Sequence, residues 1–371
     1  MNICICVNTL GYAMGGVSTH ILDLCKQFSH REDIGKVIVC CDGGELVDEL
    51  GSNPKVEYIR IPFDASGFSL KGIIQNFRRV NKIVRSEKID IIHIHSQRVL
   101  PIGYLIKLFS GVPYLWTNHI DAIPGKRLFK MMCKLMRFPI ISVSQELRSM
   151  MINEYGCEGK RVYVVNNGID LDEFSPLSQD ERTLLEQRYG IDRSKKPYVI
   201  SLLSRVSPVK GHMTLLEAIS HSAYKNQIKV IFAGHTYPEN ENYRHDLESF
   251  AESQNIELTF LDYSKPRDVF GVSDLFVLPS IYEGFALVCV EALAMNCAVL
   301  RSRTPGWQEM QDYTGVFEKN DTDGLTKMLD AAIENHFYPE RTRTGNLAVK
   351  ERFTKEVCAA GTIEVYRSLI K

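Results

Sequence analysis

The sequence is short of net charge and of long apolar runs, and both absences exclude broad classes of protein. Its 371 residues carry 44 Lys and Arg against 45 Asp and Glu, which gives a formal net charge of −1. The chain as a whole therefore lacks the positive charge that attracts nucleic acid, and we expect no nucleic-acid partner. No apolar run reaches the roughly 20 residues of a membrane-spanning helix. The first residues also lack the basic and apolar regions of a secretory signal, so we expect a cytoplasmic protein.

Cysteine is abundant, but the patterns that would give it a function are missing. None of the ten cysteines belongs to a Cys-x-x-Cys pair, and no histidine spacing suggests zinc. Most of them, such as Cys4, Cys6 and Cys40, lie inside apolar runs. These positions favour buried, reduced thiols of a cytosolic protein over disulfides. We therefore expect no bound metal and no cofactor.

The composition and the alternation of apolar runs predict the fold class. Hydrophobic residues make up 44% of the chain and charged residues 24%, as in a soluble globular protein, and 371 residues are enough for two domains. Short apolar runs, from residues 3–7 onward, alternate with stretches long enough for helices. After a polar stretch at 175–196 the same alternation restarts at 198–203. This pattern predicts two α/β domains, each with a parallel, doubly wound sheet.

One stretch, residues 279–294, carries the strongest functional pattern of the second half. It follows a short apolar strand at 274–278, and its own apolar residues recur at spacings of three and four, which predicts a helix. The first backbone amides of that helix have no partner within it. They are expected at Phe285, Ala286 and Leu287. Together with the helix dipole, such amides form a site for an anion.

Two carboxylates, Glu283 and Glu291, flank this expected anion site. Eight helical residues turn through about 80° beyond two full turns, so both side chains can face one cleft. Amides for a phosphate and carboxylates for hydroxyl groups suit a nucleotide-sugar. The simpler alternative is that Glu283 only complements the helix dipole and that Glu291 is an ordinary surface residue.

Loops after other predicted strands carry further candidates. Gly15 and Gly16 lie between a strand and a helix, where glycine lets the backbone approach a phosphate. The loop is not Gly-x-Gly-x-x-Gly, and a tight turn without a ligand is an open alternative. Arg205 and Lys210 flank a loop that enters another helix, and two cations with free amides suit a diphosphate, unless both are solvated surface residues. His119 ends a strand on the edge where open α/β sheets bind ligands, although a structural histidine is the default alternative.

Two other polar pairs are assigned no metal. His93 and His95 alternate with apolar residues, so we expect them to be structural or to line a pocket. Asp170 and Asp172 form an Asp-x-Asp pair, but it falls in the expected linker between the domains. We therefore do not expect this pair to bind a metal ion.

Two amphipathic helices of the first half have basic faces. The basic residues are Arg78 and Arg79 in one helix, and Lys126, Arg127, Lys130 and Lys134 in the other. Basic amphipathic helices lie on anionic membrane surfaces. A solvated face above a core face produces the same pattern, so both interpretations stand.

The run Glu-Gly-Phe-x5-Glu, from Glu283 to Glu291, resembles the E-x7-E motif of retaining glycosyltransferases with the GT-B fold, and the nearest match is glycosyltransferase family four. Other motifs of that family occur in the same order: its Gly-Gly-Val loop, its sugar-contacting histidine and its Arg and Lys pair match Gly15, Gly16, His119, Arg205 and Lys210. The stretch 304–309 departs from the family's Gly-Gly-x-x-Glu, because Pro305 stands in place of the first glycine. Donor contacts at this stretch are therefore in doubt.

The resemblance implies two Rossmann-like domains that face a central cleft. Residues 1–174 with 352–371 would bind the acceptor, and residues 175–351 the nucleotide-sugar. Gly234 and Tyr263 would lie near the nucleobase by analogy of fold. The implied donor-binding residues are Gly15, Gly16, Arg205, Lys210, Gly234, Tyr263, Glu283, Gly284, Phe285, Ala286, Leu287 and Glu291.

The resemblance also implies an activity. The chain would be a retaining, metal-independent transferase that moves a sugar from a nucleotide-sugar, expected to be a UDP-sugar, to a glycan or glycolipid. Its catalytic residues would be His119, Glu283, Arg205 and Lys210. The basic first half favours a lipid-linked acceptor at the inner face of the plasma membrane, in polysaccharide or lipopolysaccharide synthesis. A GT-B-fold nucleotide-sugar epimerase and transfer to a small soluble acceptor are the alternatives.

Overall fold

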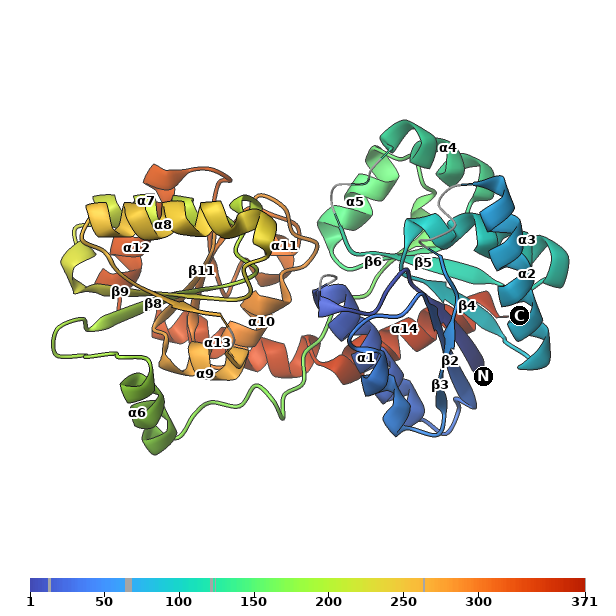
Figure 1. Cartoon of the computed structure of the whole chain (residues 1–371), viewed down its shortest axis with the longest axis horizontal. Coiled ribbons are helices and arrows are strands. Elements are labelled where there is room, and N and C mark those ends of the chain that lie inside the picture. The colour runs from blue at the N-terminus through green and yellow to red at the C-terminus, as the bar shows by residue number, and fades with distance from the viewer. Residues whose placement is uncertain (13–14, 64–68, 121–122, 124, 263, 371) are drawn as a thin grey trace. The chain divides into compact units, whose positions relative to one another are not determined.

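The computed structural model describes residues 1–12, 15–63, 69–120, 123, 125–262 and 264–370. The chain divides into two compact units (Figure 1), one of Met1–Gly168 with Lys355–Lys371 and the other of Ile169–Thr354. The borders between the units therefore fall at Gly168 and Lys355, whereas the sequence analysis placed them at residues 174 and 352.

The first unit is built on a seven-stranded sheet with the order β3-β2-β1-β4-β5-β6-β7. Its strands are β1 (Asn2–Cys6), β2 (Lys36–Cys41), β3 (Val56–Arg60), β4 (Ile91–Ile94), β5 (Tyr114–Asn118), β6 (Ile140–Ser142) and β7 (Val162–Val164). Its helices are α1 (Gly16–Ser29), α2 (Leu70–Ser86), α3 (Leu100–Ser110), α4 (Lys126–Met136), α5 (Gln145–Asn153) and the C-terminal α14 (Lys355–Leu369). Helix α14 packs beside α1 (Figure 1), and the rings of Phe28 and Tyr366 lie 5.9 Å apart.

The second unit has a six-stranded sheet with the order β10-β9-β8-β11-β12-β13. Its strands are β8 (Tyr198–Leu203), β9 (Ile228–Ala233), β10 (Glu257–Leu261), β11 (Leu275–Leu278), β12 (Ala298–Ser302) and β13 (Gly315–Phe317). Its helices are α6 (Gln179–Arg188), α7 (His212–His221), α8 (Glu241–Ser253), α9 (Pro266–Val272), α10 (Leu287–Ala294), α11 (Trp307–Met310), α12 (Thr322–Glu334) and α13 (Pro339–Arg352).

Both sheets are parallel and doubly wound, which confirms the predicted fold class. Every pairing between the named strands is parallel. The strand order reverses between β1 and β4 in the first unit and between β8 and β11 in the second. In such sheets the loops at the carboxyl ends of the strands separate at this reversal point and leave room for a ligand.

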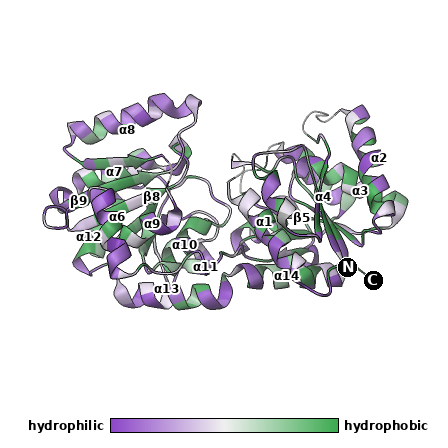
Figure 2. Ribbon diagram, turned by 60° about the horizontal axis from the view of Figure 1, so that its bottom comes forward, coloured by the Kyte–Doolittle hydropathy of each residue, from purple (hydrophilic) through white to green (hydrophobic). Residues whose placement is uncertain are grey.

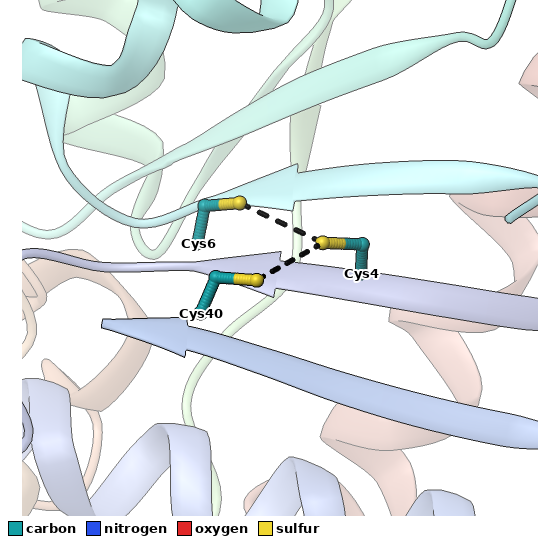
Figure 3. A group of neighbouring side chains, drawn as sticks. All are labelled: Cys4, Cys6 and Cys40. Carbon is teal, nitrogen blue, oxygen red and sulfur yellow. Dashed lines mark hydrogen bonds between the residues drawn. The ribbon is translucent and has the colours of Figure 1, made fainter. Parts of the chain in front are cut away.

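The strands of the first unit are apolar on both faces because helices cover both faces of a parallel sheet. Ile3 and Ile5 point into one buried cluster, and Cys4 and Cys6 point into the other. The side chain of Cys4 points toward those of Cys6 and Cys40 (Figure 3), and its sulfur lies 3.8 Å from each of their sulfurs. The predicted burial of the thiols is confirmed, since every cysteine except the half-buried Cys157 is buried.

Hydrophobic residues gather in the sheets and on the helix faces that cover them (Figure 2). Local capping fixes several helix starts, as at α2, where Ser69 accepts a hydrogen bond from the Gly72 amide at 3.1 Å. No helix among the described residues is both long enough and apolar enough to cross a membrane.

Candidate functional site

In the second unit, the loops that follow β8 and β11 meet at the point where the strand order reverses. The Ile281 amide donates a hydrogen bond to the carbonyl of Val209 at 2.9 Å. The Nζ of Lys210 lies 2.6 Å from Oε1 of Glu283, and the two side chains are 18% and 12% exposed. The structure therefore joins two of the predicted catalytic residues in one largely buried ion pair.

Two glycines allow these loops to pack this closely. Gly211 has a φ of 76°, and a Cβ there would lie 2.3 Å from the carbonyl oxygen of Pro279. Gly234 has a φ of 141°, and a Cβ there would lie 2.0 Å from the carbonyl oxygen of Ser204, next to Arg205. Neither position tolerates a side chain, so both glycines are needed to hold the loops after β8, β9 and β11 together.

The helix predicted to begin at Phe285 begins two residues later. Helix α10 starts at Leu287, and its first hydrogen bond runs from the Cys289 amide to the Ala286 carbonyl at 3.0 Å. Phe285 is instead buried, with its ring 5.7 Å from that of Phe353. Ala286 makes the turn between Phe285 and α10, with a φ of 63° and a ψ of 66°. The amides at the helix N-terminus are therefore those of Leu287 and Val288, not those of Phe285 and Ala286.

Helical spacing does not relate Glu283 to Glu291, as the sequence analysis assumed, because Glu283 lies in the loop before α10 and not on the helix. The charges nevertheless gather around the first turns of α10. Burial raises the pKa of Cys289, on the first turn, to about 12. Arg301 and Lys210 act against this shift, and Glu283 and Glu291 add to it, so all four charges are close enough to influence that thiol.

Ala286 is an uncommon feature of this site. A left-handed conformation costs a residue with a Cβ about 1–2 kcal/mol. Strained residues of this kind cluster at functional sites, where the surrounding structure holds them in place. Ala286 stands between Gly284 and α10, next to the predicted anion site. The strained backbone of Ala286 therefore lies in the loop that carries the Glu-Gly-Phe-x5-Glu motif, and both features mark this loop as part of the candidate site.

Arg301 is a residue that the sequence analysis missed. It follows three apolar residues in β12 (Ala298–Ser302) and is fully buried. Its Nη2 donates to the carbonyl oxygens of Thr304 and Pro305 at 3.0 and 2.9 Å. A charged residue inside an apolar strand run was the available signal. Arg301 thereby fixes the stretch at Pro305 where the sequence departs from the family pattern.

The same stretch packs against the start of the α10 loop. Gly306 has a φ of 87°, and a Cβ there would lie 2.4 Å from the carbonyl oxygen of Phe285. Of the other predicted donor residues, Tyr263 lies outside the residues that the structure describes.

In the first unit, the predicted glycine loop and His119 lie at the carboxyl ends of the strands. Gly15 precedes α1 with a φ of 53°, and Gly16 is the first residue of that helix. His119 directly follows β5, and its Nε2 lies 2.9 Å from Nδ1 of His95. The ring of His20, on α1, is 5.1 Å from that of His119. Burial lowers the pKa of His119 well below its usual value, so the imidazole is neutral.

The histidines near His119 were only partly anticipated. His93 has a structural role, which was one of the two roles predicted for it, because both of its nitrogens are hydrogen-bonded. His95 instead pairs with His119. His20 was not identified, since a single histidine within a helix pattern gives no signal of what it will meet in three dimensions.

Helix α4 exposes apolar residues beside its basic ones. Lys126, Arg127, Lys130 and Lys134 are exposed. Leu128, Met131 and Leu135 are 53%, 50% and 69% exposed. Their spacing places them on one face, separate from the buried face of Phe129 and Cys133. A solvated polar face above a core face does not explain this second apolar stripe. Arg78 and Arg79 on α2 are exposed as well.

Comparisons with known proteins match almost the whole chain. Residues 14–173 match the family model described as Glycosyltransferase Family 4, and residues 186–350 match Glycosyl transferases group 1. Alpha-maltose-1-phosphate synthase from Mycolicibacterium smegmatis is 26% identical over 96% of each chain. UDP-Gal:alpha-D-GlcNAc-diphosphoundecaprenol alpha-1,3-galactosyltransferase from Escherichia coli is 24% identical over 79% of this chain and 78% of its own.

Solved structures show the same fold. A glycosyltransferase from Rickettsia africae superposes with a TM-score of 0.88 at 19% identity, over 100% of this chain and 98% of its own. HepE from Anabaena, solved in complex with UDP and glucose, superposes with a TM-score of 0.82 at 19% identity over both complete chains. These neighbours establish the GT-B arrangement of two Rossmann-like domains as the fold of the chain.

Proposed function

The chain belongs to glycosyltransferase family 4, and from this premise we propose that it is a retaining, metal-independent enzyme that transfers a sugar from a UDP-sugar to a lipid-linked or glycan acceptor. Membership of the family supports glycosyltransferase activity itself. The stereochemistry, the donor and the acceptor are the parts of the proposal that need a test.

The observation that carries the proposal is the group of charges around the start of α10. Lys210 is held there by Glu283 at 2.6 Å, in a place with little exposure to water. Lys210 and Arg205, with the amides of Leu287 and Val288, would bind the diphosphate and stabilise the negative charge that develops as it leaves. Lys210 is largely buried, so its interactions there are stronger than in water, whereas Arg205 is exposed. Because these groups supply the positive charge, the proposed reaction needs no divalent metal ion.

The two carboxylates take different parts in the proposal. Glu291, on α10 itself, would accept hydrogen bonds from the ribose hydroxyls. Glu283, in the preceding loop, pairs with Lys210 before the diphosphate binds and would then bind a hydroxyl of the donor sugar. Gly234, against Ser204, would border the nucleobase. None of these carboxylates is assigned as a nucleophile, so we propose that the acceptor attacks from the face that the diphosphate leaves.

In the first unit, we propose that His119 and Gly16 contact the transferred sugar. His119 is neutral, because burial lowers its pKa, so its imidazole can donate or accept a hydrogen bond at a sugar hydroxyl. Gly16, at the start of α1, leaves room for the close approach of a ligand to the backbone.

Two relatives support a UDP-sugar as the donor. The printed name of the Escherichia coli galactosyltransferase specifies UDP-Gal, and HepE was solved with UDP and with UDP-glucose. The assignment of UDP as the nucleotide rests on these two likenesses.

The exposed stripe of α4 supports a lipid-linked acceptor at the inner face of a membrane. Leu128, Met131 and Leu135 could enter the lipid boundary while Lys130 and Lys134 contact anionic head groups. A hollow at the end of α4, lined by Lys134, Arg137, Arg161 and Glu158 among others, has an excess of positive charge for a phosphate group. The Escherichia coli relative is named for a diphosphoundecaprenol-linked acceptor. Such an enzyme would act in cell-surface polysaccharide or lipopolysaccharide synthesis.

Transfer to a small soluble acceptor is the second candidate. It is favoured by relatives named alpha-maltose-1-phosphate synthase and D-inositol 3-phosphate glycosyltransferase. The surface of α4 is the feature that argues against it.

The test has two stages. Thermal melting with UDP-, GDP- and ADP-sugars identifies the donor, since a ligand of the native state raises the melting temperature. The anomeric configuration of the product, determined by NMR with lipid-linked and soluble acceptors, then tests retention. UDP-sugars alone should stabilise the protein, and the product should keep the donor's configuration. An inverted product, no stabilisation by UDP-sugars, or interconversion of the donor sugar without an acceptor, as an epimerase would perform, contradicts the proposal.

A further inference from the structure

Three histidines of the first unit surround one point at the carboxyl ends of β4 and β5. His20 comes from α1, His95 directly follows β4, and His119 directly follows β5. Their ring centroids are 5.5 Å apart for His20 and His95, 5.1 Å for His20 and His119, and 5.2 Å for His95 and His119. One nitrogen of each ring lies within 4.8 Å of the others. The sequence separates these residues by 75 and 24 positions, so only the fold brings them together.

The neighbouring His93 shows how this sheet holds a structural histidine. Its Nδ1 lies 2.6 Å from the hydroxyl of Tyr366, and its Nε2 lies 2.6 Å from that of Thr117. His95 is held differently. Its Nδ1 lies 2.9 Å from His119, but its Nε2 is buried and has no hydrogen-bond partner in the part of the chain that the structure describes. A buried polar atom without a partner is costly, which indicates that the protein alone does not complete this cluster.

A neutral imidazole has one N–H and one nitrogen with a free lone pair, and the latter is the nitrogen that binds a metal ion. The Nδ1 of His20 is 4.0 Å from the sulfur of Cys358.

We propose that His20, His95 and His119 form a binding site for a transition-metal ion of the Zn²⁺ class. Zn–N bonds of 2.0–2.1 Å in a tetrahedron place two ligand nitrogens about 3.3 Å apart. One candidate ligand nitrogen of each ring lies within 4.8 Å of the others, and rotation of the rings would bring these nitrogens to that spacing. Three imidazoles without a carboxylate suit Zn²⁺, Co²⁺, Ni²⁺ or Cu²⁺, whereas Mg²⁺ and Ca²⁺ require oxygen ligands.

The site would inhibit the enzyme rather than assist it. A bound ion would occupy a nitrogen of His119 that could otherwise hydrogen-bond a sugar hydroxyl, and its open fourth position would hold a water molecule beside that residue. This consequence rests on the proposed function, whereas the binding of the ion does not.

The binding is tested on the full chain, kept reduced and freed of metal with a chelator. Titration with Co²⁺ should give one equivalent of ligand-field absorption typical of nitrogen ligands, which Zn²⁺ should then displace. His20→Asn and His119→Gln should each weaken binding by at least about tenfold, the loss that even outer-shell changes cause at metal sites. His245→Gln, at an exposed histidine of α8, is the matched control and should bind as the wild type does. Far-UV circular dichroism of each variant checks that it is folded.

Two outcomes overturn the site. The first is no binding of Co²⁺ by the folded wild type. The second is a sulfur-to-metal charge-transfer band that persists in the histidine variants and disappears in Cys40→Ser. Such a band would place the ion at the three thiols of Cys4, Cys6 and Cys40.

A transfer assay tests the inhibition separately. Zn²⁺ should inhibit the wild type, and a chelator should restore full activity. Loss of transfer in the chelator contradicts an inhibitory role. Metal binding by a chain that transfers no sugar under any condition would refute the proposed function and leave the metal site in place.

Discussion

Lys210 and Glu283 form a 2.6 Å ion pair between the loops that follow β8 and β11. Both side chains are largely buried, so each neutralises a charge that would otherwise be poorly solvated. We infer that Glu283 occupies Lys210 until a diphosphate arrives and that the two anions then compete for the same ammonium group. This competition leads to opposite predictions for the two residues.

Removal of the cation should abolish both binding and transfer. Lys210→Ala takes away a positive charge that would stabilise the leaving diphosphate, and loss of one such group typically lowers kcat by about 100-fold or more. UDP should also no longer raise the melting temperature. Lys195→Ala is the control, because Lys195 pairs with Asp192 on the surface and is 79% exposed. Equal activity of the two variants would remove Lys210 from the proposed site.

Removal of the anion should separate binding from transfer. Glu283→Gln leaves Lys210 without its partner, so UDP should bind at least as tightly as to the wild type. Transfer should nevertheless fall, because the variant loses the carboxylate that would hold the donor sugar. Isothermal titration with UDP and a transfer assay measure the two effects. A Glu283→Gln variant that loses UDP binding as Lys210→Ala does would show that the pair acts only as a structural unit.

Arg301 should contribute to stability and to the shape of the site. Arg301→Met leaves the buried carbonyls of Thr304 and Pro305 without their donor, which should lower the free energy of unfolding by about 1–3 kcal/mol. Arg303→Met is a close control, since that side chain is 39% exposed and pairs with Glu318 at the surface. Its effect should stay within about 0.5 kcal/mol. Urea unfolding measures both, and an unchanged midpoint for Arg301→Met contradicts the positioning role.

The fold class could be predicted from the sequence because the strands of a parallel sheet are buried on both faces and therefore appear as short apolar runs. It also singled out Lys210 and Glu283, since both stand in loops after predicted strands. It could not show that they meet, because their contact depends on the adjacency of β8 and β11. The start of α10 was misplaced for a local reason: Phe285 has the apolar spacing of the helix, but it turns into the core beside Phe353. His20 was missed because its neighbours His95 and His119 come from other elements. Arg301 was missed although its charge inside the apolar run of β12 was a signal.

Acid should lower the free energy of unfolding of the second unit because of His212. Burial, aided by the charge of Lys210, lowers the pKa of this first residue of α7 to about 3. In the unfolded chain its pKa is about 6.5, so below that pH the unfolded state binds a proton that the folded state does not. The stability due to neutral His212 is complete above pH 6.5 and declines by about 1.4 kcal/mol per pH unit as the pH falls toward 3.

The measurement is the free energy of unfolding at pH 7 and at pH 5. The decline between them should be about 2 kcal/mol smaller in His212→Gln than in the wild type. His221→Gln, at the exposed opposite end of α7, should decline as the wild type does. Parallel declines in all three proteins would show that His212 is protonated in the folded state.

The exposed stripe of α4 should bind anionic membranes. Leu135 and Met131 are 69% and 50% exposed beside Lys130 and Lys134, so vesicles with anionic lipid should bind the protein and neutral vesicles should not. Met131→Ser with Leu135→Ser removes apolar area that enters the lipid, and a loss of about 1–3 kcal/mol corresponds to binding that is roughly 5- to 150-fold weaker. Leu184→Ser, on α6 and 66% exposed, is the control. Cosedimentation measures the difference. If the α4 variant binds as the control does, this face does not contact the membrane, and the soluble acceptor becomes the better candidate.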